Sequence, residues 1–136
     1  MTVGTALPGS ARSADRFLGI AGVLLAIATV IGALAAHALQ RVLPAAQLTS
    51  LHTAVNYQFF NALGLLAVGL LLRSEPRRSM HVVAWLLIAG IVCFSGGIYI
   101  MLAGAPSLLG LVTPLGGILL IGAWLLFAVS VLRGLR

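Results

Sequence analysis

Four polar side chains stand close together in an otherwise apolar stretch, and they are the residues best placed to do chemistry. They are Asn56, Tyr57, Gln58 and Asn61, in a segment that continues to Leu72. Amides and phenols bind ligands through hydrogen bonds, but inside a membrane they are costly unless they find partners. Neighbouring helices or a ligand must therefore satisfy these side chains.

Other polar residues are expected at the same level of the bundle. Helical spacing puts Tyr57 and Asn61 on one face, and it does the same for Ser95 and Tyr99. In an antiparallel bundle, the outer halves of all the helices meet at one depth. We therefore predict one hydrogen-bonded binding cluster in the outer half. Its candidate residues are His37, His52, Asn56, Tyr57, Gln58, Asn61, Ser95, Tyr99 and Thr113.

The residues needed for catalysis or metal binding are missing from the apolar runs. These runs hold no carboxylate, no Ser-His-Asp set and no His-x-x-x-His pair. His37 and His52 flank one short connector, and paired imidazoles can hold a metal or haem. Each lies at a helix end, however, where an interfacial histidine is ordinary. We predict no catalytic residue, no metal and no cofactor, and we read the lone Cys93 as a core residue.

Composition identifies the class of protein. The 136 residues are 61% hydrophobic and 7% charged, with a mean hydropathy of +1.16. A soluble domain carries about 25% charged residues, so this chain cannot cover a water-facing surface. It is therefore expected to be a polytopic membrane protein.

Four apolar runs predict four antiparallel transmembrane helices in one all-α domain, residues 17–136. Each run has the roughly 20 residues needed to cross about 30 Å of hydrocarbon. Residues 1–16 are expected to form a flexible tail. The uncharged segment 103–112 is expected to lie at the interface or to dip back into the bundle. The predicted spans are 17–39, 53–72, 81–102 and 113–132.

Local signals add detail to the spans. Small residues recur at spacings of three and four in the first span, which predicts its packing seam. Thr49 or Ser50 is expected to cap the second helix, and Thr113 to cap the fourth, with Pro114 as the first helical residue. Gly96 and Gly97 predict close approach or irregularity in the third helix. The predicted seam consists of Gly19, Gly22, Ala26, Thr29, Ala33 and Ala36.

Charge predicts orientation. All eight basic residues are arginines outside the apolar runs, and only Arg41 lies in a loop between the first two spans or the last two. The positive-inside rule then places both termini in the cytoplasm. No basic stripe alternates with aromatic residues, so nucleic acid is not an expected partner. The expected partners are membrane lipids, and a second copy or a larger membrane complex.

Four motifs in order resemble the YgdD-type small inner-membrane proteins of unknown function, which have a small eukaryotic relative. The resemblance implies a four-helix integral membrane protein and brings no established activity. That family usually has His where this chain has Asn61, which does not titrate and is a poor metal ligand. The motifs are Gly32-Ala33-Leu34-Ala35-Ala36-His37-Ala38-Leu39, Thr53-Ala54-Val55-Asn56-Tyr57-Gln58, Phe94-Ser95-Gly96-Gly97-Ile98-Tyr99, and Thr113-Pro114-Leu115-Gly116-Gly117 with Gly122-Ala123-Trp124.

These observations favour a small multi-pass protein of the bacterial inner membrane. Its predicted role is structural, as an accessory subunit acting through helix packing. The alternative is a small transporter or binding protein for a solute, ion or lipid, using the outer polar cluster. The lack of membrane-embedded Asp or Glu argues against proton-coupled transport.

Overall fold

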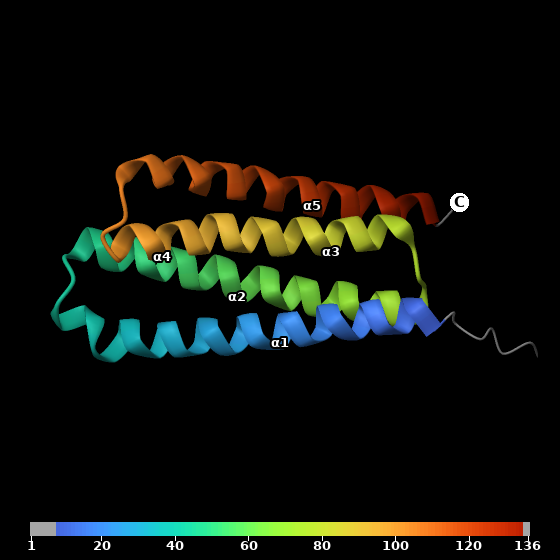
Figure 1. The fold of residues 1–136 in the computed structure, drawn as a ribbon, viewed down its shortest axis with the longest axis horizontal. Coiled ribbons are helices and arrows are strands. Elements are labelled where there is room, and N and C mark those ends of the chain that lie inside the picture. Colours follow the sequence, from blue (N-terminus) through green and yellow to red (C-terminus); the bar gives the residue numbers. More distant parts are fainter. Residues whose placement is uncertain (1–7, 135–136) are drawn as a thin grey trace, which may run out of the picture.

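Within residues 8–134, the fold comprises four helical runs long and apolar enough to cross a membrane. The computed structural model describes residues 8–134, with side chains from Arg12 onward, and this part contains no strand. The all-α prediction is confirmed. The runs alternate in direction (Figure 1). The first, second and fourth runs are α1 (Pro8–His37), α2 (Ala45–Ser74) and α5 (Val112–Gly134). The third run consists of three consecutive segments, α3 (Arg78–Ile91), η2 (Val92–Gly96) and α4 (Gly97–Leu102).

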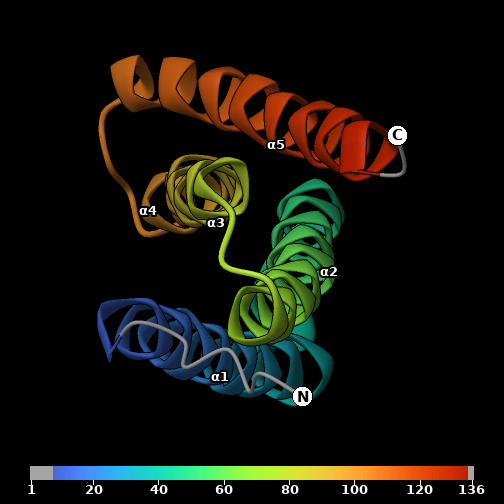
Figure 2. The same ribbon diagram turned by 90° about the vertical axis from the view of Figure 1, so that its right-hand side faces the viewer.

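The helices form three layers rather than a closed ring. In Figure 2, α2 and α3 occupy the middle, with α1 on one side and α5 on the other. The main packing of α1 is against α2, whereas α5 packs on α3 and η2. The outer helices are therefore the least covered: 17% of the most apolar window is buried in the first and fourth runs, against 44% and 39% in the others.

The seam between α1 and α2 is a seven-residue repeat. Ala14, Ala21, Ala28 and Ala35 are all fully buried. They face a repeat on α2 with the same spacing, made of Leu51, Gln58, Leu65 and Leu72, each at most 4% exposed. Small residues on one helix admit large residues from the other, so the two axes approach closely.

The predicted seam on α1 was wrong. Gly19, Gly22, Ala26, Thr29, Ala33 and Ala36 are all exposed. Within the described residues, no side chain or backbone of another helix comes within 4 Å of a Cβ placed on Gly19 or Gly22. The helix carries two stripes of small residues, and the alanine repeat is the one that meets α2. The stripe that runs from Gly19 to Ala36, which we call the outward stripe, faces away from the other helices.

The third run is interrupted by a π turn, η2, at Val92–Gly96. This confirms the irregularity predicted near Gly96 and Gly97. Here α5 comes very close: a Cβ on Gly116 would lie 2.7 Å from the Phe94 Cα, and one on Gly97 would lie 2.7 Å from the Thr113 Oγ1. Glycine at these two positions is required because backbone or buried atoms occupy the space of a side chain.

Both predicted helix caps were wrong. The second helix begins at Ala45, after Pro44, so Thr49 and Ser50 lie inside it and donate to the carbonyls of Ala45 and Ala46. The N-cap residue is Pro44, and no side chain caps this helix in the described structure. Thr113 lies inside α5, and its buried hydroxyl has no hydrogen-bond partner among the described residues.

The loops lie at two ends, which we name the terminal end and the distal end. The terminal end holds both described chain ends and the α2–α3 turn, while η1 (Leu39–Arg41) and η3 (Ser107–Leu111) lie at the distal end (Figure 1). Residues in η3 do not dip into the bundle: Leu108 and Leu111 are 77% and 75% exposed. Interfacial placement is therefore the alternative that fits segment 103–112.

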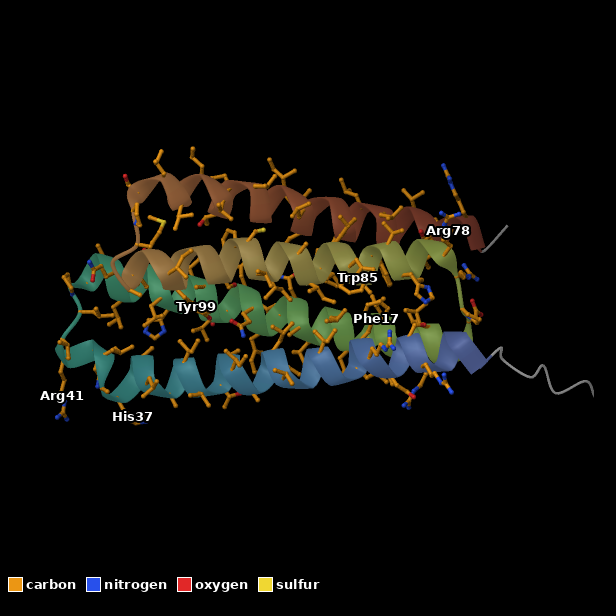
Figure 3. The ribbon with its side chains drawn as sticks, in the orientation of Figure 1. Phe17, His37, Arg41, Arg78, Trp85 and Tyr99 are labelled. Carbon is orange, nitrogen blue, oxygen red and sulfur yellow. The ribbon has the colours of Figure 1, made fainter. Side chains whose placement is uncertain are left out.

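Contacts at the terminal end fix the start of α1. Helix α1 begins at Pro8, earlier than the tail boundary predicted at Arg16, and residues 1–7 lie outside the described part. Asp15 accepts a hydrogen bond from the Arg73 Nε at 3.0 Å. The ring of Phe17 meets the edge of Trp85, with centroids 5.5 Å apart (Figure 3). These contacts tie the first turns of α1 to α2 and α3.

Candidate functional site

Gln58 links three helical segments at the centre of the predicted cluster. It lies on the buried repeat of α2 and is 2% exposed. Its Nε2 donates to the Leu24 carbonyl of α1 at 2.7 Å, and its Oε1 accepts from the Tyr99 hydroxyl of α4 at 2.9 Å. Figure 3 shows Tyr99 on the inner side of the bundle. The amide therefore bonds to protein at both ends, through one Nε2 hydrogen and through its Oε1.

Ser95 makes a further bridge between α2 and the third run. It lies in η2, is 1% exposed, and donates to the Ala54 carbonyl at 2.8 Å. Because a π turn widens the helix locally, it changes the direction of the side chains within it. Ser95, Gln58 and Tyr99 thus hold the distal half of α2 against its neighbours.

Asn61 belongs to a second group, toward α5. It is 7% exposed, and its Oδ1 accepts a hydrogen bond from the Trp124 Nε1 at 2.9 Å. Its Nδ2 donates to the Tyr57 carbonyl at 2.8 Å. The edge of the Trp124 ring faces Gly64, where a Cβ would be 2.5 Å from two ring carbons. Trp124 therefore joins α5 to α2 across the middle of the bundle.

Trp124 was not among the predicted site residues, although the sequence held a signal for it. An indole N–H in the middle of a span must find an acceptor, and the amide of Asn61 lies at a similar depth. Equal depth in the predicted spans 53–72 and 113–132 could therefore have predicted that Asn61 and Trp124 form a pair.

The side chains of the remaining candidates, including Thr113, take no part in these hydrogen bonds. His37, His52 and Asn56 are exposed, and Figure 3 shows His37 pointing away from the bundle. The Tyr57 side chain is 47% exposed and stacks on Phe94, with ring centroids 4.6 Å apart. Of the nine candidates, the structure joins Gln58 with Tyr99, and it places Ser95 and Asn61 nearby with partners of their own.

Within residues 8–134, no three His, Cys, Asp or Glu side chains gather where they could hold a metal ion. Cys93 is half-buried rather than part of the fully buried core. The two hydrogen-bonded groups consist of amides, hydroxyls, an indole and backbone carbonyls. Such groups can orient a neutral ligand or hold helices in register, and they carry no charge.

Comparison with known proteins identifies the family. The family model described as "Protein of unknown function (DUF423)" matches residues 31–117, from the end of α1 to the start of α5. The chain belongs to the DUF423 family. The matched region contains Gln58, Asn61, Ser95 and Tyr99, so the DUF423 match includes most of the hydrogen-bonded groups.

Named relatives of this DUF423 chain are membrane proteins. The UPF0382 membrane protein YwdK of Bacillus subtilis is 39% identical over 85% of this chain and 94% of its own. SSP2132 of Staphylococcus saprophyticus is 36% identical over 85% and 94%, and a Haemophilus influenzae relative is 31% identical over 84% and 91%. No solved structure matches the chain. These names agree with a small membrane protein and specify no activity.

The bond between Gln58 and Tyr99 gives a first test of the polar residues as structural links. Gln58→Leu leaves the Tyr99 hydroxyl without its acceptor, and Tyr99→Phe leaves the Gln58 Oε1 without its donor. We expect each variant to lower the free energy of unfolding by about 1–2 kcal/mol. The double variant should cost less than the sum, with a coupling of about 0.6 kcal/mol. Reversible unfolding in mixed micelles measures all four proteins, and strict additivity contradicts a direct bond.

Proposed function

We propose that this protein is a non-enzymatic accessory protein of the bacterial inner membrane. It acts by packing the outward stripe of α1 against a transmembrane helix of a second copy or of a larger complex. The supporting observation is that all six residues of the stripe are exposed. Small residues let helix backbones approach closely, which is how helices associate where lipid removes the hydrophobic driving force.

The distribution of arginines supports an orientation with both termini in the cytoplasm. Arg12, Arg16, Arg73, Arg77, Arg78 and Arg133 belong to the terminal end, and Asp15 and Glu75 each pair with one of them. The distal end has only Arg41, which Figure 3 shows beyond the tip of α1. Cytoplasmic ends of inner-membrane proteins carry such an excess of positive charge.

The predicted alternative, a binding or transport protein using the distal polar residues, has less support. Gln58, Ser95 and Tyr99 all direct their polar atoms at other protein groups. A solute binding there would have to break these hydrogen bonds before making its own. The same residues are better suited to hold the helices in register.

Cysteine cross-linking in membranes tests the proposed packing surface. In a Cys93→Ala background, Ala26→Cys places a thiol on the outward stripe. Ile27→Cys is the matched control, because it is also exposed, lies at the same depth, and points about 100° away around the helix. We expect oxidation to link two copies efficiently through residue 26 and poorly through residue 27.

The competing outcomes are distinct. If a larger complex is the partner, the thiol at residue 26 instead forms one defined product with a second protein, again absent at residue 27. Equal products at both positions, or none at either, would show that the stripe faces only lipid and would overturn the proposal.

A further inference from the structure

A groove of about 460 Å³ lies between α2 and α5, across the surface of η2. We call it the α2–α5 groove, and the residues used below are Tyr57, Asn61, Phe94, Gly117 and Trp124. Ile121 and Leu125 at its edge are 63% and 64% exposed. Because both are apolar and lie within a membrane-spanning helix, the groove opens sideways into hydrocarbon. A ligand would reach it from the bilayer.

Asn61 lines this groove and uses one of its two amide hydrogens within the described structure. A primary amide nitrogen carries two hydrogens. One is donated to the Tyr57 carbonyl, and the described structure gives the second no acceptor. Near the centre of a membrane no water is at hand to accept it, so the unpaired N–H costs free energy. A bound molecule with an acceptor at this point would recover that cost.

The other walls of the groove are aromatic and uncharged. The Tyr57 and Phe94 rings stack at 4.6 Å, and Trp124, which is held by its bond to Asn61, also lines the groove. Aromatic walls favour a flat ligand through offset or edge contacts. The absence of charge among the lining residues favours a neutral ligand. Gly117 leaves the floor without a side chain.

From these features we propose that the α2–α5 groove binds a flat, neutral, membrane-soluble carbonyl compound of the quinone type. A ring carbonyl accepts the second Nδ2 hydrogen of Asn61, and the ring lies between the aromatic walls. A lipid acyl chain could fill the apolar space but has no acceptor at this depth. A neighbouring transmembrane helix would insert side chains into the groove, and the apolar side chains that dominate such helices likewise have no acceptor.

The test uses two ligands of one shape. The first is a naphthoquinone with methyl groups at both free positions of its quinone ring, so that it cannot alkylate Cys93. The second is the matching dimethylnaphthalene, which lacks the two oxygens. In nanodiscs of a Trp85→Phe variant, saturable quenching of Trp124 reports quinone binding, and competition reports the hydrocarbon. We expect the quinone to bind about five-fold more tightly, the effect of one hydrogen bond.

Variants assign this preference to Asn61. Asn61→Leu should reduce the ratio of quinone affinity to hydrocarbon affinity to about one. Asn56→Leu makes the same change at an exposed position of α2 and should keep this ratio at about five. Gly117→Leu fills the groove and keeps Asn61, so it should abolish saturable binding of both ligands, even if Asn61→Leu does not fold. Equal affinity for the two ligands, or unsaturable quenching in the unsubstituted groove, overturns the proposal.

Discussion

Gly116→Ala is expected to destabilise the protein by about 3 kcal/mol, the upper range for forcing extra atoms into a packed site. The added Cβ would lie 2.7 Å from the Cα of Phe94 and 2.8 Å from the carbonyl carbon of Cys93. These are backbone atoms of η2, which cannot rotate away as a side chain can. Relief requires α5 to move off the third run, and Trp124 and its bond to Asn61 would move with it. Unfolding in mixed micelles, followed by circular dichroism, measures the loss.

Gly117→Ala provides the matched control one residue further along α5. Its Cβ would meet only the Phe94 ring, at 3.8 Å, which is ordinary contact. Alanine is favoured over glycine in a helix by about 1 kcal/mol, so this variant should be neutral or slightly more stable. Opposite signs at adjacent glycines would locate the close approach at Gly116. Similar losses at both would contradict the described helix contact.

A second large effect is expected from Ala28→Leu, on the buried repeat of α1. Ala28 is fully buried against α2, so the larger side chain should lower the free energy of unfolding by about 3 kcal/mol. It should also disturb the nearby hydrogen bond from Gln58 to the Leu24 carbonyl. The measurement is again unfolding in mixed micelles, with infrared amide bands as a second reading.

Ala26→Leu makes the same change on the exposed outward stripe and should leave monomer stability within about 0.5 kcal/mol. It should nevertheless weaken self-association, because a leucine holds the facing backbone away. One helix thus offers separate tests of internal packing and of association. A large loss of monomer stability in Ala26→Leu, with none in Ala28→Leu, would mean that the two stripes have been exchanged.

Sequence alone predicts the four helices that are long and apolar enough to cross a membrane, because this property depends on composition and length. It failed to choose between the two stripes of α1. Both stripes have a spacing that suits helix packing, the outward stripe with Gly19, Gly22 and Ala26 as much as the buried repeat with Ala21 and Ala28. The choice depends on which stripe meets the large residues of α2, and that is a property of the pair of helices. The overlooked signal was that the buried alanines of α1 and the large residues of α2 recur at the same strict spacing of seven residues.

The polar residues show a similar division. Gln58, Ser95 and Tyr99 were predicted to lie together, since they occupy equivalent depths on helices that had to be antiparallel. The sequence could not show that Asn61 turns toward Trp124, because that depends on the rotation of α5 about its axis. His37, His52 and Asn56 were grouped with the others by depth, but they point outward. Depth follows from the sequence, whereas facing direction follows from packing.

The π turn at Val92–Gly96 makes the third run tolerant of a one-residue deletion. A π turn holds about one residue more than an α turn while advancing around the helix axis by a similar angle. Removing one residue here should therefore close the segment into a continuous α-helix and leave Tyr99 facing Gln58. In α2, which has no such turn, removing one residue between Gln58 and Asn61 would instead rotate the two side chains apart by about 100°. A relative one residue shorter in the π turn should thus keep the bond between Tyr99 and Gln58.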